Sequence, residues 1–244
     1  LRAMAHSLGH ARSGEQAFYL KTDCWHIHEI DLIRDAFPQA PWIFLYRDPV
    51  DVMVSHQRVP AAWTVPQLLN PRALKLEADD WDPRQTEVYC ARALALMCEA
   101  ALKAARGDER ALLLNYSELP HATCDRVLAH FGLPAAGILE MQARAGQDAK
   151  APQSRFAPDH ESKQAAATQR LRNTVTLHLA DVYRRLEQAR LAQSTAPSAG
   201  IPEPNIRSEQ ASVNCERVTH LTSVECKLAT RVRRLTLEGE IISD

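Results

Sequence analysis

The sequence predicts an α/β fold in which a parallel sheet is flanked by helices. Two continuous apolar runs, PWIFLY (residues 41–46) and ALLLNY (residues 111–116), have the length and composition of strands buried on both faces. Strand and helix signals also alternate over about the first 45 residues that carry a pattern, which is typical of βαβα units. The chain of 244 residues suits one large domain, or one domain with an appendage.

The first elements follow in order. Residues 17–21 (AFYLK) predict a short strand, and the apolar residues Ile27, Ile30 and Phe37 recur at near-helical spacing until Pro38 ends the pattern. After the strand at 41–46, Asp48 is expected as the N-cap of a helix that has Pro49 at its first position.

The later elements are less regular. Residues 60–82 are rich in proline and predict a long loop, and residues 146–164 predict an irregular segment. Apolar residues at helical spacing predict three further helices, which are Gln85–Arg106 ending at Gly107, His121–Phe131, and Thr168–Gln193.

Composition excludes several classes of protein. The net charge of −1 provides no overall field that would attract nucleic acid or an anionic membrane, so any anion site must be local. No apolar run reaches the roughly 20 residues of a spanning helix, and the first residues lack a signal-peptide pattern. The six cysteines are scattered and are expected to be buried thiols, and their spacing predicts no metal site. We therefore expect a cytoplasmic protein with no membrane or nucleic-acid partner.

A change of composition near residues 197–204 predicts a boundary. Residues 1–196 are assigned to the α/β domain and residues 197–244 to a tail of unknown role, in which only Ala211 and Ala229 are alanine after residue 200. The stretches 213–221 and 231–241 have strand-like alternation. The tail is a foreign extension, a small appended element or a poorly ordered end, and we expect the core to fold without it.

Arg47 is the sharpest candidate for a binding residue. It follows the strand at 41–46, and ligands of open parallel sheets bind beyond the carboxyl ends of strands. A guanidinium group suits two phosphate oxygens at once, and Ser55, two helical turns further on, offers a hydroxyl donor. The alternative is a structural ion pair between Arg47 and Asp48 or Asp51, with Ser55 as an ordinary helix residue.

An apolar strand followed by R-[DN]-x-x-D-V-x-x-S resembles the 3′-phosphate motif of the sulfotransferases that use 3′-phosphoadenosine 5′-phosphosulfate. Arg47, Asp51, Val52 and Ser55 match every fixed position of that motif. The resemblance implies that Arg47 and Ser55 hold the 3′-phosphate of the nucleotide.

A second match lies upstream, where FYLKTD (residues 18–23) resembles the strand and loop that read Lys-Thr-His in the cytosolic members of that family. The resemblance implies that Lys21 contacts the phosphosulfate. Asp23 stands where the family has its histidine base, so the resemblance leaves either His26 or Asp23 as the general base. The alternative is that Lys21 is a solvated strand end and His26 a residue of a helix start.

A third match lies downstream, where LLLNYSEL (residues 112–119) resembles the strand and turn whose tyrosine contacts the adenine side of the nucleotide, here Tyr116. Family members also bring a basic loop onto the 3′-phosphate, and residues 148–163, with Lys150 and Arg155, are the candidate. The alternatives are a tyrosine that serves packing and a solvated loop.

The resemblance implies transfer of a sulfuryl group from the nucleotide to a hydroxyl or amine of a small-molecule acceptor, with no metal. Residues 60–82, with Trp63 and Trp81, are expected to shape the acceptor pocket. The family's first strand, phosphosulfate loop and helix are not found in residues 1–16, so the sequence looks truncated at its N-terminus and the activity of this chain is left open. Two alternatives remain, a degenerate nucleotide-binding or scaffold protein and a P-loop kinase, which would need a G-x-x-x-x-G-K-[ST] loop.

Overall fold

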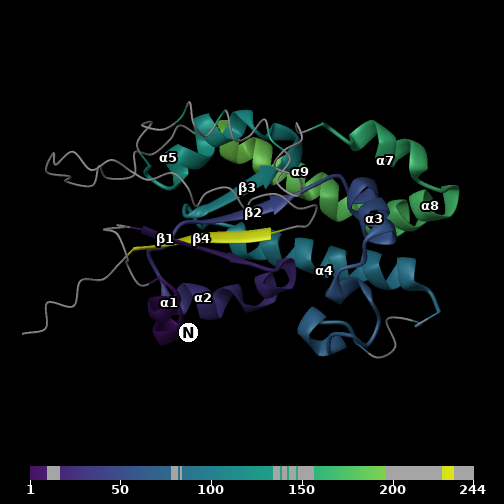
Figure 1. Ribbon diagram of the computed structural model, residues 1–244, viewed down its shortest axis with the longest axis horizontal. Coiled ribbons are helices and arrows are strands. Elements are labelled where there is room, and N and C mark those ends of the chain that lie inside the picture. The colour runs from purple at the N-terminus through teal and green to yellow at the C-terminus, as the bar shows by residue number, and fades with distance from the viewer. Residues whose placement is uncertain are drawn as a thin grey trace, which may run out of the picture.

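The computed structural model describes residues 1–9, 17–77, 82, 84–133, 138, 142, 147, 157–195 and 227–233. Its centre is a four-stranded sheet with the order β1-β4-β2-β3 and helices on both faces, which confirms the predicted α/β class (Figure 1). The strands are β1 (Ala17–Thr22), β2 (Trp42–Tyr46), β3 (Ala111–Asn115) and β4 (Lys227–Arg233).

Three of the four strands run in the same direction. β2 pairs with β3 in parallel, and β4 pairs with both β1 and β2 in the antiparallel sense. Since β1 and β2 are both antiparallel to β4, they are parallel to each other. The carboxyl ends of β1, β2 and β3 therefore meet at one edge of the sheet, which is where a ligand site was predicted.

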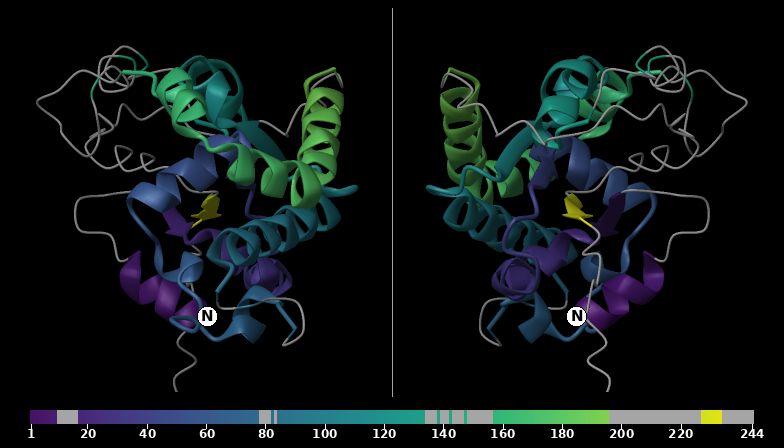
Figure 2. Two further views of the ribbon diagram at one scale, coloured as in Figure 1. Left: turned by 90° about the vertical axis from the view of Figure 1, so that its right-hand side faces the viewer. Right: turned by 90° about the vertical axis from the view of Figure 1, so that its left-hand side faces the viewer.

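The position of β4 differs from expectation, because this strand comes from the segment predicted to be a dispensable tail. β4 lies near the middle of the molecule, between β1 and β2 (Figure 2). In the described part of the chain, β1 hydrogen-bonds to the rest of the sheet only through β4. A core that includes β1 is therefore incomplete without it, because two strand spacings, about 10 Å, separate β1 from β2. Of the two tail strands predicted, 213–221 lies outside the described residues and 231–241 overlaps β4 at three positions. The division at residue 197 stays a prediction.

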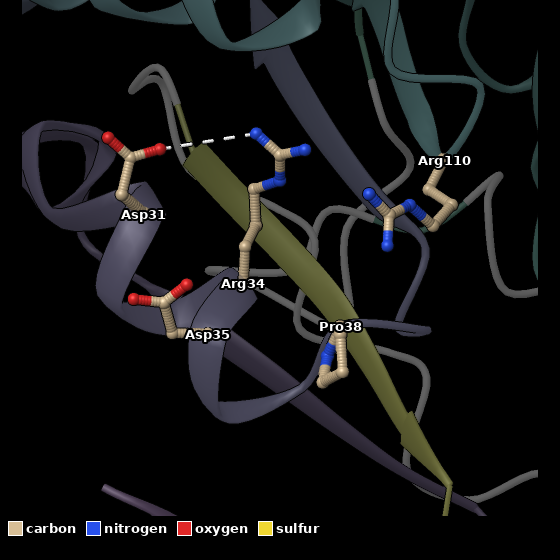
Figure 3. A pocket seen from close by; sticks show the side chains of 5 residues that line it. All are labelled: Asp31, Arg34, Asp35, Pro38 and Arg110. Carbon is tan, nitrogen blue, oxygen red and sulfur yellow. Dashed lines mark ion pairs between the residues drawn. The ribbon is translucent and has the colours of Figure 1, made fainter.

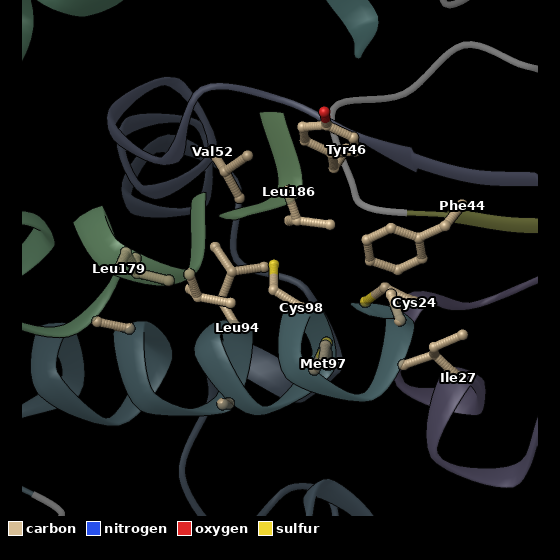
Figure 4. Close-up of a cluster of buried hydrophobic side chains, with 14 of the residues drawn as sticks. Cys24, Ile27, Phe44, Tyr46, Val52, Leu94, Met97, Cys98, Leu179 and Leu186 are labelled. Atoms are coloured by element: carbon tan, nitrogen blue, oxygen red, sulfur yellow. The ribbon is translucent and has the colours of Figure 1, made fainter. Parts of the chain in front are cut away.

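Alternation along β2 explains how the sheet separates two apolar cores. Trp42, Phe44 and Tyr46 belong to the larger cluster, which Figure 4 shows packed against the apolar residues of α4 (Thr86–Ala105). Ile43 and Leu45 point to the other face, where the chain between Ala122 and Phe131 covers them. Burial of both faces is what a continuous apolar strand predicts, and all five residues of β2 are buried.

The helices flank this sheet along the chain. The α-helices are α1 (Arg2–Leu8), α2 (Ile30–Ala36), α3 (Pro49–Arg58), α4 (Thr86–Ala105), α5 (Leu128–His130), α7 (His160–Ala166), α8 (Gln169–His178) and α9 (Ala180–Thr195). Short 3₁₀ turns are η1 (Cys24–Glu29), η2 (Ala62–Thr64), η3 (Pro71–Leu74) and η5 (Tyr116–Glu118), and one π turn is η6 (Thr123–Val127).

Most predicted boundaries hold within a few residues. The Asp48 side chain accepts hydrogen bonds from the backbone N–H groups of Val50 and Asp51, which confirms it as the N-cap of α3. Gly107 has φ +71°, the left-handed conformation that glycine adopts after a helix end. The predicted buried state of the cysteines is confirmed for Cys24, Cys90 and Cys98.

Two helical predictions were wrong in detail. The helix predicted over Thr168–Gln193 is interrupted at Leu179, and the bend lets α8 and α9 both bury their apolar stripes with α4. α7 lies inside the stretch predicted to be irregular. Both differences matter below, because α7 and α9 bring polar side chains to the carboxyl ends of the strands.

The outer edge of β3 is covered by a side chain rather than by another strand. Gln193 of α9 accepts a hydrogen bond from the Leu113 N–H and donates one to the Ala111 carbonyl oxygen. These two groups would otherwise be unpaired at an edge strand. The amide thus fixes α9 along this edge and positions the residues one and two turns before it.

Candidate nucleotide-binding site

Arg47 is the first polar residue after the five buried residues of β2, and it is itself 9% exposed. Its Nε and Nη2 donate to Oδ2 of Asp51 at 2.9 and 2.8 Å, and Nη2 also donates to Oδ1 of Asp159 at 2.5 Å. No bond to Nη1 is present within the described part of the chain. The guanidinium therefore holds two carboxylates and keeps one of its donor groups for another partner.

The electrostatics of this cluster keep Arg47 charged. Burial alone would lower the pKa of Arg47, but its hydrogen bonds to Asp159 and Asp51 outweigh that effect and raise the pKa above its usual value. Asp51 is the more deeply buried partner, with a side chain 2% exposed, whereas the side chain of Asp159 is 43% exposed. The structural alternative for Arg47, a pair with Asp51, is thus part of the arrangement. It does not exhaust the donors of the guanidinium.

Tyr116 lies beside Arg47 at the same edge of the sheet. The guanidinium carbon of Arg47 is 4.8 Å from the centre of the Tyr116 ring, within the range of a cation–π contact. Tyr116 begins the turn η5, which Asn115 and Glu118 cap reciprocally: the Asn115 side chain accepts from the backbone, and Glu118 accepts from the Asn115 N–H. The carboxyl ends of β2 and β3 thereby bring two predicted nucleotide-binding residues into contact.

α7 covers the Arg47 side of α3. Gln164 donates to carboxylate oxygens of both Asp48 and Asp51, and Nδ1 of His160 lies 2.9 Å from Oδ2 of Asp51. The Lys163 side chain is 3% exposed, and its Nζ forms an ion pair of 2.7 Å with Oδ2 of Asp159. That contact lacks the angle of a directed hydrogen bond, and Nζ has no such bond within the described residues. Lys163 is thus a second buried cation beside Arg47.

Ser55 carries an unusual hydroxyl. It lies four residues after Asp51, so the two residues share one face of α3. Its Oγ is buried and has no hydrogen-bond partner among the residues that the structure describes. A buried hydroxyl without a partner costs free energy, so the group calls for a partner from outside the described chain.

The residues predicted to act on the sulfuryl group lie further along this edge. Lys21 of β1 and Ile43 of β2 both pair with Ala229 of β4, so Lys21 lies level with a residue four positions before Arg47. Four strand residues and two strand spacings separate the Cα atoms of Lys21 and Arg47 by about 16 Å. Lys21 and Arg47 are at one edge of the sheet but do not touch, and only an extended ligand meets both.

His26 and Asp23 lie just after β1. Asp23 is exposed and occupies the N-cap position of η1, but its side chain accepts no capping hydrogen bond, so the expected capping role was wrong. The His26 ring stacks on Trp25 with 3.8 Å between the ring centres, and its Nδ1 lies 3.3 Å from the Asp23 carbonyl oxygen. Because a carbonyl oxygen only accepts, this contact places the hydrogen on Nδ1 and leaves the lone pair on Nε2.

His28, two residues on, has a different environment. Burial and then the positive charge of Lys75 lower its pKa to about 4, although Glu29 opposes this. Its Nε2 is buried and has no hydrogen-bond partner in the described residues. His28 is therefore a packed, neutral ring rather than an accessible proton acceptor.

A polar network ties α9 to the strand ends next to Arg47. Glu187 of α9 accepts hydrogen bonds from the Tyr46 hydroxyl at 2.5 Å and from the Asn115 amide at 2.8 Å, and it pairs with Arg190. Burial first, and then the bond to Glu187, raise the pKa of Tyr46 far above its usual value. The network fixes the ends of β2 and β3, from which Arg47 and Tyr116 project.

A cavity of about 330 Å³ lies elsewhere, at the amino ends of β2 and β3. Figure 3 shows its lining by three residues of α2, with Pro38 and Arg110. Its two arginines are both paired with the buried carboxylate of Asp108, which also accepts from the Trp42 indole. These pairs hold α2 and β3 against the sheet, and the cavity is at the wrong edge for the predicted nucleotide. Trp63, expected in an acceptor pocket, is instead buried against His56.

The structure thus brings Arg47 and Tyr116 together and places Ser55 on the adjoining helix face. Lys150, Arg155 and Trp81 lie outside the described residues. Sequence reasoning missed Asp159 as a partner of Arg47, because no local signal connects two residues 112 positions apart. Lys163 fell within the basic loop that was predicted, but only its burial beside Asp159 distinguishes it from other lysines.

A comparison with known protein families agrees with these features. The model of the Sulfotransferase family matches residues 2–137, more than half of the chain. The chain belongs to the sulfotransferase family and is thereby assigned to the transferases. No curated protein and no solved structure gives a significant match. The matched range includes Lys21, Arg47, Ser55 and Tyr116, and it ends before α7.

Two further findings concern partners. None of the helices in the described part is long and apolar enough to cross a membrane. Within the same residues no group of three or more His, Cys, Asp or Glu side chains has the arrangement of a metal site. The expectation that the reaction needs no metal stays a prediction.

Proposed function

We propose that this chain binds a nucleotide through its 3′-phosphate and that the whole protein transfers a sulfuryl group from 3′-phosphoadenosine 5′-phosphosulfate to a hydroxyl or amine of a small acceptor. Membership of the sulfotransferase family supports the reaction class. The observation that carries the proposal is the contact between Arg47 and Tyr116 at the carboxyl ends of β2 and β3, beside the unpartnered hydroxyl of Ser55.

The donors at this place fit a phosphate group. Arg47 has its Nη1 uncommitted within the described residues, Ser55 offers a buried O–H, and Lys163 adds a buried ammonium. Oxyanions are bound best by charged donors of this kind, and arginine binds them with two parallel bonds. Arg47 and Ser55 hold the 3′-phosphate in this proposal, and Tyr116 contacts the adenosine side. Lys150 and Arg155 stay predicted ligands of the same phosphate.

The bound nucleotide supplies the activated sulfuryl group, and the chain supplies orientation and a proton acceptor. Lys21, exposed at the end of β1, contacts the transferring group and offsets the charge that collects there. The separation of about 16 Å between Lys21 and Arg47 matches the idea that each residue meets a different end of one extended ligand. An acceptor hydroxyl or amine must lose its proton during attack, so a base is required near Lys21.

His26 is our candidate for that base. Its Nδ1–H is directed to the Asp23 carbonyl oxygen, which orients the ring and leaves Nε2 to take a proton. Its half-buried position and the stacked Trp25 ring restrict its movement. Asp23 is the second candidate, and the absence of any capping bond from its side chain leaves its oxygens available. His28 is not a candidate, since its buried Nε2 has no path to an acceptor.

A non-enzymatic nucleotide-binding protein is the alternative. The observation that favours it is that Asp23 stands where the family's histidine base is expected, while the 3′-phosphate residues are kept. Both functions predict nucleotide binding, and only turnover separates them.

Calorimetry with adenosine 3′,5′-bisphosphate and adenosine 5′-monophosphate tests the proposal. The bisphosphate should bind, weakly, and the monophosphate hardly at all, because the candidate donors address the 3′-phosphate. Arg47→Lys keeps the positive charge but loses the planar fork, so it should weaken the bisphosphate about tenfold. Equal affinity for both nucleotides would sink the proposal, and so would an Arg47→Lys variant that binds as well as the wild type.

A further inference from the structure

One exposed carboxylate joins two buried cations at the candidate site. Oδ1 of Asp159 lies 2.5 Å from Nη2 of Arg47, and Oδ2 lies 2.7 Å from Nζ of Lys163. The Arg47 and Lys163 side chains are 8% and 3% exposed, whereas that of Asp159 is 43% exposed. The anion therefore lies on the solvent side of the cations.

The arrangement is the one that an oxyanion ligand requires. Each of the two carboxylate oxygens meets a different charged donor, as two oxygens of a phosphate or sulfate would. Burial alone would raise the pKa of Asp159, but Lys163 and Arg47 outweigh that effect and lower it, so the carboxylate is ionised. The two cations are thus neutralised by a group of the chain itself.

The two carboxylates around Arg47 differ in how they are held. Asp51 has a side chain 2% exposed, and it also accepts from Gln164 and lies 2.9 Å from His160. The Asp159 side chain has no bond beyond those to Arg47 and Lys163 in the described residues. Asp51 is a fixed structural partner, and Asp159 is the partner that can be exchanged.

We propose that Asp159 is an internal competitor, an autoinhibitory carboxylate that occupies the anion site formed by Arg47 and Lys163 until an oxyanion ligand displaces it. Asp159 directly precedes α7, and Lys163 is on α7, so displacement changes how α7 lies on α3. The identity of the natural ligand rests on the proposed function, but the competition itself does not.

Competition sets the expected size of the effect. A site that is occupied by its own side chain most of the time binds ligand with an affinity reduced by the fraction of molecules in the open state. Loss of two charge-assisted contacts to Asp159 should therefore increase affinity for an oxyanion about tenfold or more.

Asp159→Asn tests this, because it removes the charge and keeps the size of the side chain. Glu161→Gln is the matched control, since Glu161 is an exposed carboxylate in the first turn of the same helix and has no contact with Arg47. Thermal unfolding is followed in increasing sodium sulfate, against sodium chloride of equal ionic strength. Asp159→Asn should be stabilised at sulfate concentrations about tenfold lower than the wild type, and Glu161→Gln should respond as the wild type does.

A sulfate response of Asp159→Asn equal to that of the wild type overturns the proposal, and so does a variant that no longer folds, since an exchangeable carboxylate cannot be essential to the fold. Calorimetry with adenosine 3′,5′-bisphosphate on the same proteins separates this result from the proposed function. If sulfate binding rises but no protein binds the bisphosphate, Asp159 is a competitor and the assignment of the nucleotide fails. If the wild type binds the bisphosphate and Asp159→Asn binds it no better, the nucleotide assignment stands and the competitor fails.

Discussion

Arg47 and Asp159 are 112 positions apart in the sequence, yet Nη2 of Arg47 donates to Oδ1 of Asp159 at 2.5 Å. The contact joins the carboxyl end of β2 to the start of α7. It means that the residue with the strongest claim to bind a phosphate already holds an anion from the chain. The same guanidinium also holds the buried Asp51, so Arg47 has a structural role as well as the proposed binding role.

The structural role of Arg47 predicts a large loss of stability in Arg47→Ala. That change leaves the buried carboxylate of Asp51 without its main cation, and such a loss costs about 3 kcal/mol of the free energy of unfolding. Arg184→Ala, which breaks an exposed ion pair with Asp181, should cost less than about 1 kcal/mol. Urea unfolding measures both, and equal losses in the two variants would contradict the structural role.

The position of β4 predicts that truncation depends sharply on where the chain is cut. A chain that ends after Arg233 keeps β4 and should melt as the full chain does. A chain that ends after Cys226 loses β4 and with it the pairing of β1 to the sheet, so its melting temperature should fall by several degrees or more. If both truncated chains melt at the temperature of the full chain, β4 is not part of the folded core.

The buried ring of His28 predicts a dependence of stability on pH. Its pKa falls from 6.5 to about 4 on folding, so between these values the unfolded chain binds a proton that the folded chain does not. The stability that the neutral ring confers is full above pH 6.5 and is lost as the pH falls toward 4. For this half-buried group we expect a loss of about 1–2 kcal/mol between pH 7.5 and pH 5.

His28→Gln removes that titrating group. The difference in free energy of unfolding between wild type and variant should therefore shrink in the wild type's disfavour as the pH falls. Chemical denaturation at the two pH values measures it, and a difference that stays constant rules out the shifted histidine.

The network around Glu187 predicts a cooperative loss. Tyr46→Phe removes the hydroxyl that donates to this carboxylate, and Asn115→Ala removes a second donor. Each change should cost about 1.5–3 kcal/mol, because a hydrogen bond to a charged, partly buried group is lost. The double variant should not equal the sum of the single ones, since both donors act on one carboxylate. Strict additivity in urea unfolding would show that they are independent.

Much of the fold was predictable because it depends on local patterns. The buried runs of β2 and β3, the Asp48 cap and the helix end at Gly107 are each encoded within a few neighbouring residues. The central place of β4 was not predictable, since strand order depends on pairing between segments 200 residues apart, and the alternation in that segment gave no sign of its partners.

The candidate site divides in the same way. Arg47, Ser55 and Tyr116 were found because they follow strands in motifs of short span. Asp159 and Lys163 reach Arg47 only through the packing of α7 on α3, and the sequence at 146–164 predicted no helix there. The failed expectation that Asp23 caps η1 has a simple cause: the residue is at the N-cap position, but its side chain is not directed to the backbone N–H groups.

Ser55 provides the most direct test of the proposed site, because stability and binding should change in opposite directions. Its buried hydroxyl has no partner in the described residues, so Ser55→Ala should leave the free energy of unfolding unchanged or raise it by about 1 kcal/mol. If that hydroxyl binds the 3′-phosphate, the same change should weaken adenosine 3′,5′-bisphosphate about tenfold. Ser194→Ala, at an exposed position of α9, is the control and should change neither.

The decisive measurement is therefore the calorimetric affinity of Ser55→Ala for adenosine 3′,5′-bisphosphate, made beside its urea unfolding curve. We predict a protein at least as stable as the wild type that binds the bisphosphate about tenfold more weakly. Wild-type affinity in a stable Ser55→Ala protein would contradict the assignment of the 3′-phosphate site to α3.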